Sequence, residues 1–282
     1  MIRKPFGSNG ADLPEIGQGT WDLPESGLRL EEARRSLRRG IELGMTHVDM
    51  AEMYGGGRVE EIVGETIAGI PRERLFLASK VLPGNASYAG TMRACESSLR
   101  RLQTEYLDLY MLHWPGAHPL EETMGALEAL VEQGKTRYIG VSNFDVDQLR
   151  AAASYLRRAE LACDQLFYHL HERGIERHLM PYCALHGIAI VAYTPFGRGR
   201  FPRKAAAAGG VLSRIGERHG KTPRQVILNF LTREPHAFAI PKASRVEHVE
   251  ENAAAAGWRL EAGDIAEIDA AFPVRDGPLA TL

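Results

Sequence analysis

Two kinds of apolar segment alternate along this chain. Short continuous runs rich in leucine and β-branched residues are separated by longer segments whose apolar residues recur at helical spacing. The short runs predict strands that are buried on both faces, and such strands are typical of a parallel sheet covered by helices. The predicted strands are 16–20, 46–49, 75–80, 106–113, 138–141, 161–167, 188–193 and 238–242.

At least one predicted helix follows every strand. In the first of them Ala33, Leu37 and Ile41 recur every four positions among charged residues, which is the pattern of an amphipathic helix. In a later helix Thr222 is placed as the N-cap and Gln225 as its capping-box partner. The other predicted helices are 59–67, 92–102, 124–131, 147–156, 175–185, 211–219, 223–231, 246–254 and 264–271.

Eight strand–helix units in a chain of 282 residues predict a closed α/β barrel, the (β/α)8 or TIM barrel. No linker or shift in composition divides the chain, so we expect a single domain over residues 1–282. The segment 4–14, which contains Ser8-Asn9-Gly10, is expected to form a β-hairpin that plugs the bottom of the barrel. Two of the predicted helices exceed the eightfold repeat and are expected to be additions to it.

The composition is that of an ordinary globular protein, with 44% hydrophobic and 25% charged residues. A net charge of −2 gives no electrostatic reason to expect nucleic acid or an anionic membrane as a partner. The three cysteines, Cys95, Cys163 and Cys183, form no CxxC pair, which disfavours a disulfide scaffold and a cysteine-based zinc site. The segment 1–10 has no signal-peptide core, and no uncharged apolar run reaches the roughly 18 residues of a membrane helix. We expect a cytoplasmic protein with reduced thiols, as a monomer or weak dimer.

Polar side chains stand where the predicted strands end. A carboxylate (Asp49), an amine (Lys80) and an imidazole (His113) end the second, third and fourth strands, and Tyr54 follows soon after Asp49. The active site of an α/β barrel is built at the C-terminal ends of its strands, so these side chains are expected to converge on one cavity. The remaining strand ends carry Thr20, Ser142 with Asn143, Gln165, Tyr193 and Lys242.

At these residues the chain resembles the aldo-keto reductase superfamily, and the similarity runs nearly end to end. Each matching segment is short, but their order and spacing along one chain are specific. Among members of the superfamily, the chain is most similar to bacterial reductases of methylglyoxal and other small aldehydes. The matching segments are Gly17-Gln-Gly-Thr20, Val48-Asp-Met-Ala-Glu-Met-Tyr54-Gly55, Ala78-Ser-Lys80, Tyr106-Leu-Asp-Leu-Tyr-Met-Leu-His113-Trp114-Pro115, Gly140-Val-Ser-Asn-Phe144, Gln165, Ala192-Tyr193-Thr-Pro195 and Ile240-Pro-Lys242.

The resemblance implies NADPH-dependent reduction of aldehydes or ketones to alcohols, with a catalytic tetrad of Asp49, Tyr54, Lys80 and His113. Hydride arriving at a carbonyl carbon leaves negative charge on the oxygen, so a proton donor must meet that oxygen, and Tyr54 is the expected donor. A lysine ammonium stabilises phenolate and lowers the pKa of a phenol beside it, while a carboxylate keeps the lysine charged. His113 is expected to hydrogen-bond the carbonyl oxygen and stabilise its developing charge.

Each tetrad residue also has a purely structural interpretation. Asp49 could form a turn, Lys80 could end a strand in solvent, Tyr54 could be a loop aromatic, and His113 could be a core histidine. Only their joint occurrence in the order of the family favours the catalytic interpretation.

The cofactor site cannot be found from a glycine motif, because the chain contains no G-x-G-x-x-G. The resemblance implies that Ser142, Asn143 and Gln165 bind the nicotinamide amide and that Tyr193 stacks under its ring. It places the adenosine 2′-phosphate near residues 242–252, where Lys242 and a helix N-terminus offer positive charge. The full set of implied cofactor contacts is Gly19, Thr20, Trp21, Asp49, Ser142, Asn143, Gln165, Tyr193, Pro195, Phe196, Gly197, Arg198, Lys242, Ala243, Ser244, His248, Glu251 and Asn252.

Two positions in the implied phosphate site depart from the family pattern. Many members carry serine where this chain has Ala243 and arginine where it has His248, and Arg245 could substitute for the latter. Ser244 and Glu247 also match an ordinary capping box, a role that can coexist with phosphate contact. Glu251 and Asn252 match the pair that contacts adenine in the family, so NADPH is the expected cofactor, with NADH as the alternative.

The substrate is expected to meet Trp21, Tyr54, His113 and Trp114. Trp21, Trp114 and Phe196 follow three different strands and could form an aromatic mouth or simply pack at the rim. The loop 114–120 and the tail 273–282 are both short, which indicates an open pocket for small aldehydes.

Two other functions are compatible with a barrel. A metal-dependent hydrolase would explain His169-Leu-His171, with His178 and His186 nearby, but no carboxylate partner stands at the eighth strand, and we expect no metal site. A non-catalytic subunit that senses a nicotinamide cofactor is the second alternative. The presence of all four tetrad residues disfavours it.

Overall fold

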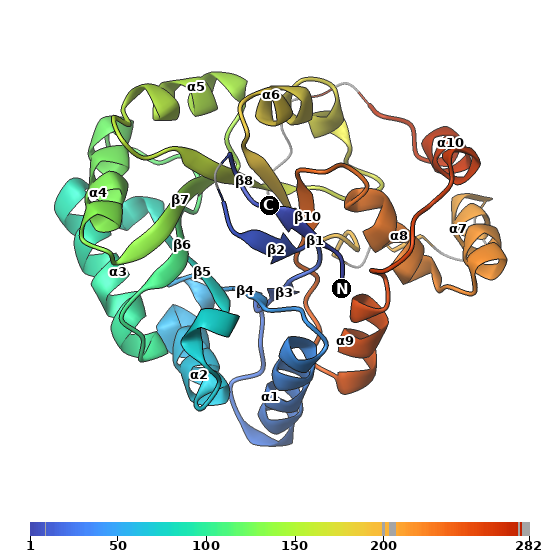
Figure 1. Ribbon diagram of the computed structural model, residues 1–282, viewed down its shortest axis with the longest axis horizontal. Helices are drawn as coiled ribbons and strands as arrows, with labels where there is room; N and C mark the ends of the chain where they lie inside the picture. The colour runs from blue at the N-terminus through green and yellow to red at the C-terminus, as the bar shows by residue number, and fades with distance from the viewer. Residues whose placement is uncertain (9, 199–200, 203–206, 276, 278–282) are drawn as a thin grey trace.

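Eight parallel strands form the centre of the computed structural model, which describes residues 1–8, 10–198, 201–202, 207–275 and 277 (Figure 1). Each strand pairs with the next one along the chain, and parallel bridges from Ile16 to Ala239 and from Gly19 to Lys242 join the last strand to the first. These bridges close the sheet, and the predicted (β/α)8 barrel is confirmed. The strands are β3 (Gln18–Gly19), β4 (His47–Asp49), β5 (Phe76–Val81), β6 (Leu107–Leu112), β7 (Thr136–Ser142), β8 (Leu161–Phe167), β9 (Ala189–Tyr193) and β10 (Ala237–Ala239).

Helices surround the barrel on its outer face (Figure 1). Two of them, α7 and α10, pack against each other at one edge of the molecule and are the expected additions to the eightfold repeat. Among the described residues no helix has the length and apolar character needed to cross a membrane. The helices are α1 (Gly27–Glu42), α2 (Arg58–Ile67), α3 (Tyr88–Leu102), α4 (Leu120–Glu132), α5 (Val146–Ser154), α6 (Leu179–Leu185), α7 (Ala207–His219), α8 (Pro223–Leu231), α9 (Val246–Ala253) and α10 (Ala262–Ala271), with short 3-10 turns η1 (Tyr54–Gly57), η2 (Arg72–Arg74), η3 (Pro83–Asn85) and η4 (Gly174–Glu176).

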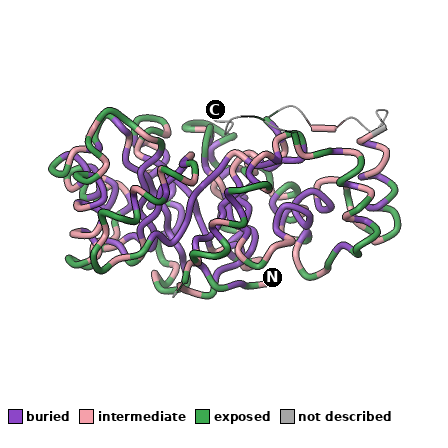
Figure 2. The backbone as a smooth tube through the Cα atoms, turned by 90° about the horizontal axis from the view of Figure 1, so that it is seen from above, coloured by how far each residue is buried: buried purple, intermediate pink, exposed green. Residues whose placement is uncertain are grey.

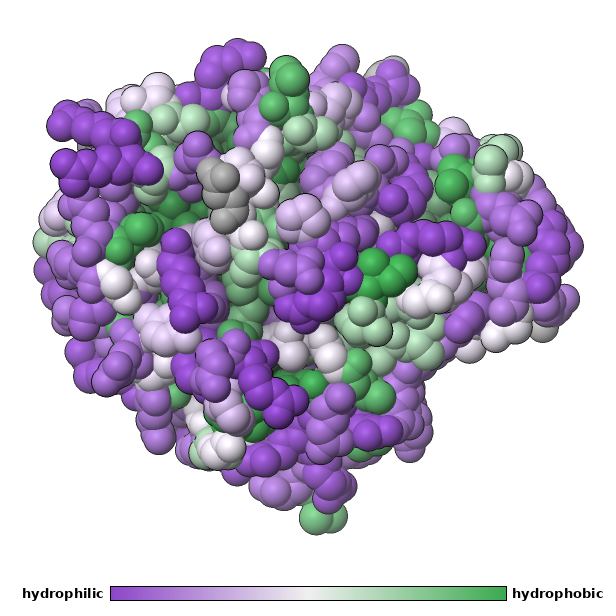
Figure 3. All heavy atoms as spheres, viewed as in Figure 1, coloured by the Kyte–Doolittle hydropathy of each residue, from purple (hydrophilic) through white to green (hydrophobic). Residues whose placement is uncertain are grey.

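The N-terminal hairpin closes one end of the barrel, as the sequence predicts. Strands β1 (Arg3–Pro5) and β2 (Asp12–Pro14) pair antiparallel, and the Phe6 ring enters the barrel between Phe76 and Phe238, at 5.3 and 5.4 Å between ring centroids. Asn9 in the middle of the predicted turn lies outside the described residues. Buried residues, in purple, occupy the interior of the molecule in Figure 2. The face of the barrel that carries the hairpin is seen in Figure 3, and its surface is largely hydrophilic with scattered apolar side chains.

Proline shortens two of the predicted elements. The helix expected over 175–185 is divided into η4 and α6, because Pro181 has no N–H and is tolerated only in the first turn of a helix. The strand expected over 238–242 ends at Ala239, since Pro241 cannot donate to the ladder. The capping box of Thr222 and Gln225 at the start of α8 is confirmed.

Candidate active site

A cavity of about 350 Å³ opens where the parallel strands end. Residues from seven of the eight strands or the loops that follow them line it, so segments far apart in the sequence share one wall. Lys80 alone of the tetrad does not line the cavity, because it lies fully buried beneath it. The lining residues are Gly19, Thr20, Trp21, Asp49, Met53, Tyr54, His113, Trp114, Ser142, Asn143, Gln165, Tyr193, Thr194, Arg198, Ile240 and Lys242.

Lys80 and Asp49 form a buried ion pair at the base of this cavity. The Lys80 Nζ donates to Asp49 Oδ1 at 2.6 Å and to the Met50 carbonyl at 2.7 Å. Burial lowers the pKa of Lys80, but the neighbouring Asp49 and Tyr54 outweigh it, so the pKa lies above its ordinary value. Lys80 therefore stays an ammonium at neutral pH, which agrees with the role expected for Asp49.

Tyr54 begins the η1 turn just after β4. The Nζ atom of Lys80 lies 5.2 Å from the centroid of its ring, and the His113 ring lies edge-on at 5.8 Å. Burial raises the pKa of the Tyr54 phenol, and the Lys80 charge lowers it by less. The Lys80 charge thus acts in the expected direction, but desolvation of the phenolate is larger, so the pKa of Tyr54 lies above its ordinary value.

His113 is a neutral imidazole in this site. Its side chain is buried at the end of β6, and burial, reinforced by the Lys80 charge, lowers its pKa to about 2. Its Nδ1 atom is buried with no hydrogen-bond partner among the described residues. A neutral imidazole carries one N–H, which it can donate in a hydrogen bond to a substrate oxygen.

Amide and hydroxyl groups from β7, β8, β9 and the residue after β7 form another part of the lining. The Tyr193 hydroxyl donates to Asn143 Oδ1 at 2.8 Å, and Asn143 Nδ2 donates to Ser142 Oγ at 3.0 Å. Gln165 Nε2 donates to Asp49 Oδ2 at 2.8 Å, which connects this part of the lining to the ion pair. Asn143 has a φ of +62°, a conformation that asparagine adopts more readily than most residues.

The predicted phosphate-binding segment, residues 242–252, covers the end of the loop after the last barrel strand and most of α9. Lys242 reaches the cavity, whereas Ala243, Ser244, His248, Glu251 and Asn252 do not line it. The proposed capping box of Ser244 with Glu247 is wrong. Helix α9 has Arg245 as its N-cap with no side-chain cap. The Ser244 hydroxyl is instead buried without a partner among the described residues, which leaves it available to a ligand.

Only some of the residues expected at the mouth line the cavity. Trp21 and Trp114 line the cavity and are 41% and 37% exposed, as expected of a mouth, and the Arg198 guanidinium stacks on the Trp21 ring at 4.1 Å. Phe196 does not line the cavity, because its ring packs against Phe201 and the Arg224 guanidinium. Pro195 and Gly197 also lie outside the lining, and most of the tail 273–282 lies outside the described residues.

A model of the Aldo/keto reductase family matches residues 15–272. The chain belongs to the aldo/keto reductase family. This aldo/keto reductase is 40% identical to methylglyoxal reductase YeaE of Escherichia coli, over 97% of the chain and 96% of that protein. It is 36% identical to glyoxal reductase of Bacillus subtilis, over 93% of the chain and 90% of that protein. An aldo/keto reductase from Klebsiella pneumoniae, crystallised with NADP and acetate, superposes with a TM-score of 0.91 at 40% identity, covering 100% of this chain and 99% of that one.

Three residues of the aldo/keto reductase line its cavity without having been predicted. Met53 directly precedes Tyr54, Thr194 lies between Tyr193 and Pro195, and Ile240 follows β10. Their nearness in sequence to predicted site residues was a usable signal for all three. Thr194 is unusual because a β-branched residue has a φ of +50° and a buried hydroxyl without a partner among the described residues.

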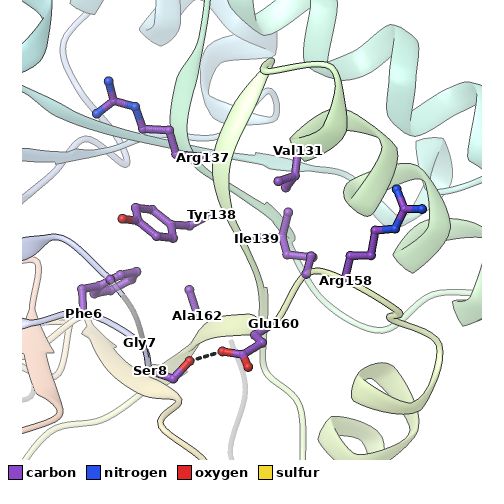
Figure 4. Close-up of a pocket in the computed structure, with 12 residues that line it drawn as sticks. Phe6, Gly7, Ser8, Val131, Arg137, Tyr138, Ile139, Arg158, Glu160 and Ala162 are labelled. Atoms are coloured by element: carbon purple, nitrogen blue, oxygen red, sulfur yellow. Dashed lines mark hydrogen bonds between the residues drawn. The ribbon is translucent and has the colours of Figure 1, made fainter.

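A second cavity of the reductase, about 300 Å³, lies beside the hairpin turn at the other end of the barrel. Its side chains offer no catalytic constellation (Figure 4). The Ser8 hydroxyl donates to Glu160, while Arg137 and Arg158 point away from the space between Phe6 and Ala162. Across the described residues, no group of three or more His, Cys, Asp or Glu side chains could hold a metal ion.

Proposed function

We propose that this enzyme reduces small aldehydes and ketones of the methylglyoxal type to alcohols with NADPH, and that Tyr54 donates the proton. One observation carries the proposal: a fully buried Lys80 ammonium is paired with Asp49 and lies against the Tyr54 ring at the base of a cavity. A charged group is costly to bury unless it is paired, so its position beside a phenol in a cavity is typical of catalysis.

The residues present fit a phosphorylated nicotinamide dinucleotide. Asn143 and Gln165 place amide groups on the cavity wall, where they could bind a carboxamide, and the Tyr193 ring lines the same wall. The partnerless buried hydroxyl of Ser244 and the Lys242 ammonium lie where a phosphate would be held at the start of α9. The relative from Klebsiella pneumoniae was crystallised with NADP, which supports the same cofactor.

The bound dinucleotide would supply the hydride. Residues of this chain orient the carbonyl group, donate the proton and stabilise the charges that develop. As negative charge develops on the carbonyl oxygen, the neutral His113 donates an N–H to it and orients it. The Tyr54 hydroxyl gives its proton to the same oxygen. The Lys80 ammonium then stabilises the phenolate, and Asp49 keeps Lys80 protonated and in place. The raised pKa of Tyr54 keeps the phenol protonated at neutral pH and ready to donate.

Pocket shape supports a small substrate. The cavity measures about 350 Å³, Trp21 and Trp114 line it, and Met53 adds an apolar side chain next to Tyr54. Two relatives are named for methylglyoxal and glyoxal, both small dicarbonyl compounds. We further infer a cytoplasmic enzyme, supported by three cysteines that are all buried and unpaired. A monomer or weak dimer is the oligomeric state that we propose.

The test is a steady-state assay of NADPH oxidation with methylglyoxal, glyoxal, a larger aromatic aldehyde and a sugar aldehyde. We expect the highest kcat/KM with the small dicarbonyls, and a lower KM for NADPH than for NADH. Cofactor binding seen by tryptophan fluorescence, without turnover of any carbonyl, would instead indicate a cofactor-sensing subunit. Turnover abolished by a chelator would contradict the proposal.

A further inference from the structure

The turn that carries Tyr54 has little conformational restraint of its own. Tyr54 is followed by three glycines with φ angles of +57°, +60° and +97° at Gly55, Gly56 and Gly57. Glycine populates many backbone conformations, so this sequence does not by itself keep the phenol at a set distance from Lys80. Contacts from elsewhere in the fold must do so.

The side chain of Arg101, near the end of α3, packs directly against the last residue of this turn. A Cβ atom on Gly57 would lie 2.7 Å from both Cδ and Nε of Arg101. Real Cβ atoms do not approach other atoms so closely, so the arginine occupies the space that a side chain at position 57 would need. By contrast, a Cβ on Gly56 would meet nothing within 4 Å.

Glu60 holds Arg101 in that place. Its carboxylate is fully buried in the first turn of α2, and Oε2 accepts from Arg101 Nε at 2.6 Å. Its other oxygen, Oε1, accepts from the Ser79 hydroxyl at 2.5 Å. Ser79 immediately precedes Lys80 in β5. One buried carboxylate therefore connects the arginine under the Tyr54 turn to the strand that carries Lys80.

We propose that Glu60 and Arg101 are positioning residues that set the distance between the Tyr54 phenol and the Lys80 ammonium. The proposal rests on the proposed role of Tyr54 as proton donor. Neither side chain lines the cavity, so they act through the turn and not on substrate. Proton transfer requires hydrogen-bond distance, and displacement of a reacting group by about 1 Å can cost about 100-fold in rate.

The first experiment compares Glu60→Gln with Asp108→Asn in the full-length enzyme. Asp108 is a matched control, because it is equally buried, pairs with Arg72 at 2.6 Å and accepts from the Leu77 amide, but lies near the start of β6, away from the cavity. Both variants are expected to lower the melting temperature. Only Glu60→Gln is expected to lower kcat, by about 10- to 100-fold with KM changed less than about threefold. Its pH–rate profile should also shift, because the effect of the Lys80 charge on the pKa of Tyr54 depends on the distance between the two groups.

A second pair of variants leaves the ion pair chemically intact. Both substitutions strain a backbone with positive φ, +97° at Gly57 and +60° at Gly56, but only Gly57→Ala also forces a Cβ into the Arg101 side chain. We expect Gly57→Ala to reproduce the loss in kcat and Gly56→Ala to stay within about threefold of the wild type. Equal kcat values for the two alanine variants would overturn the proposal even if Glu60→Gln failed to fold.

A measurement independent of turnover separates this proposal from the assignment of Tyr54 as acid. The protein is labelled with 3-fluorotyrosine, and the ¹⁹F resonance of residue 54 is identified by its loss in Tyr54→Phe. We expect this resonance to move in Glu60→Gln and Gly57→Ala and not in Asp108→Asn. An unmoved resonance overturns the positioning role. A moved resonance with a fully active Tyr54→Phe would keep the positioning role and reject Tyr54 as the acid.

Discussion

The Nζ atom of Lys80 lies 5.2 Å from the centroid of the Tyr54 ring, although Lys80 lies near the end of β5 and Tyr54 begins the turn that follows the adjacent strand β4. This short distance makes the Lys80 ammonium the main charge that stabilises a phenolate at Tyr54. Asp49 completes the arrangement by holding Lys80 from the adjacent strand β4.

Removing the phenol oxygen should abolish most turnover and leave cofactor binding intact. Tyr54→Phe keeps the ring and its packing but loses the proton donor, and general acid catalysis contributes about 10²- to 10⁴-fold. We expect kcat to fall within that range, measured by NADPH oxidation, with the Kd for NADPH within about twofold. Retention of more than about a tenth of the wild-type kcat would exclude Tyr54 as the acid.

Removing the ammonium should change the pH dependence in a defined direction. Carbonyl reduction needs protonated Tyr54, so its rate falls as pH rises through the pKa of the phenol. Burial already raises that pKa and Lys80 opposes the rise. Lys80→Met should therefore move the alkaline limb of the kcat profile to higher pH as well as lowering kcat. A profile that keeps its wild-type inflection would show that Lys80 does not act on the phenol.

Lys242 should matter for NADPH and little for NADH, because only NADPH carries the 2′-phosphate. A charge-assisted hydrogen bond contributes roughly 1.5–3 kcal/mol, about 10- to 150-fold in Kd. Lys242→Ala is expected to weaken NADPH by that factor in fluorescence titrations, more at low salt than at high salt. Equal losses for both cofactors would place Lys242 elsewhere along the dinucleotide.

Ser244 offers a test with two readouts. Its buried hydroxyl has no partner among the described residues, so Ser244→Ala should leave the melting temperature unchanged or slightly raised. A helix-capping serine would instead cost about 1 kcal/mol on replacement by alanine. The same variant should weaken NADPH binding and spare NADH. A clear drop in melting temperature would restore the capping role.

His47 should make the fold sensitive to acid. It lies inside the barrel against Phe6 and Phe76, and burial lowers its pKa to about 4. The unfolded chain binds a proton at this site near pH 6.5 and the folded chain does not, so stability present above pH 6.5 is lost as pH falls toward 4, by about 3 kcal/mol. His47→Leu should flatten the fall in unfolding free energy between pH 7 and 5, measured by urea denaturation. The exposed His186→Leu should not. Equal slopes in wild type and His47→Leu would contradict this assignment.

Ser244 shows why local sequence was insufficient at the start of α9. The pattern S-x-x-E is compatible with a capping box, which would make Ser244 the N-cap and start the helix at Arg245. The helix begins one residue later, with Arg245 as its N-cap. The Ser36 hydroxyl of α1 donates to the carbonyls of Ala243 and Arg245. A contact from a distant helix therefore sets the backbone path that decides whether Ser244 can cap.

The order of strands and helices, the plugging hairpin and the residue types at the strand ends were all readable from the sequence. Periodicity and chain order carry that information, because burial on one or two faces requires apolar residues at fixed spacing. The single domain and the roles of the site residues remain predictions. The tertiary structure decided the net rise in the pKa of Tyr54, the neutral state of His113 and the contact of Arg101 with Gly57. Those properties depend on desolvation and on distances between groups far apart in the chain, and neither quantity exists until the barrel closes.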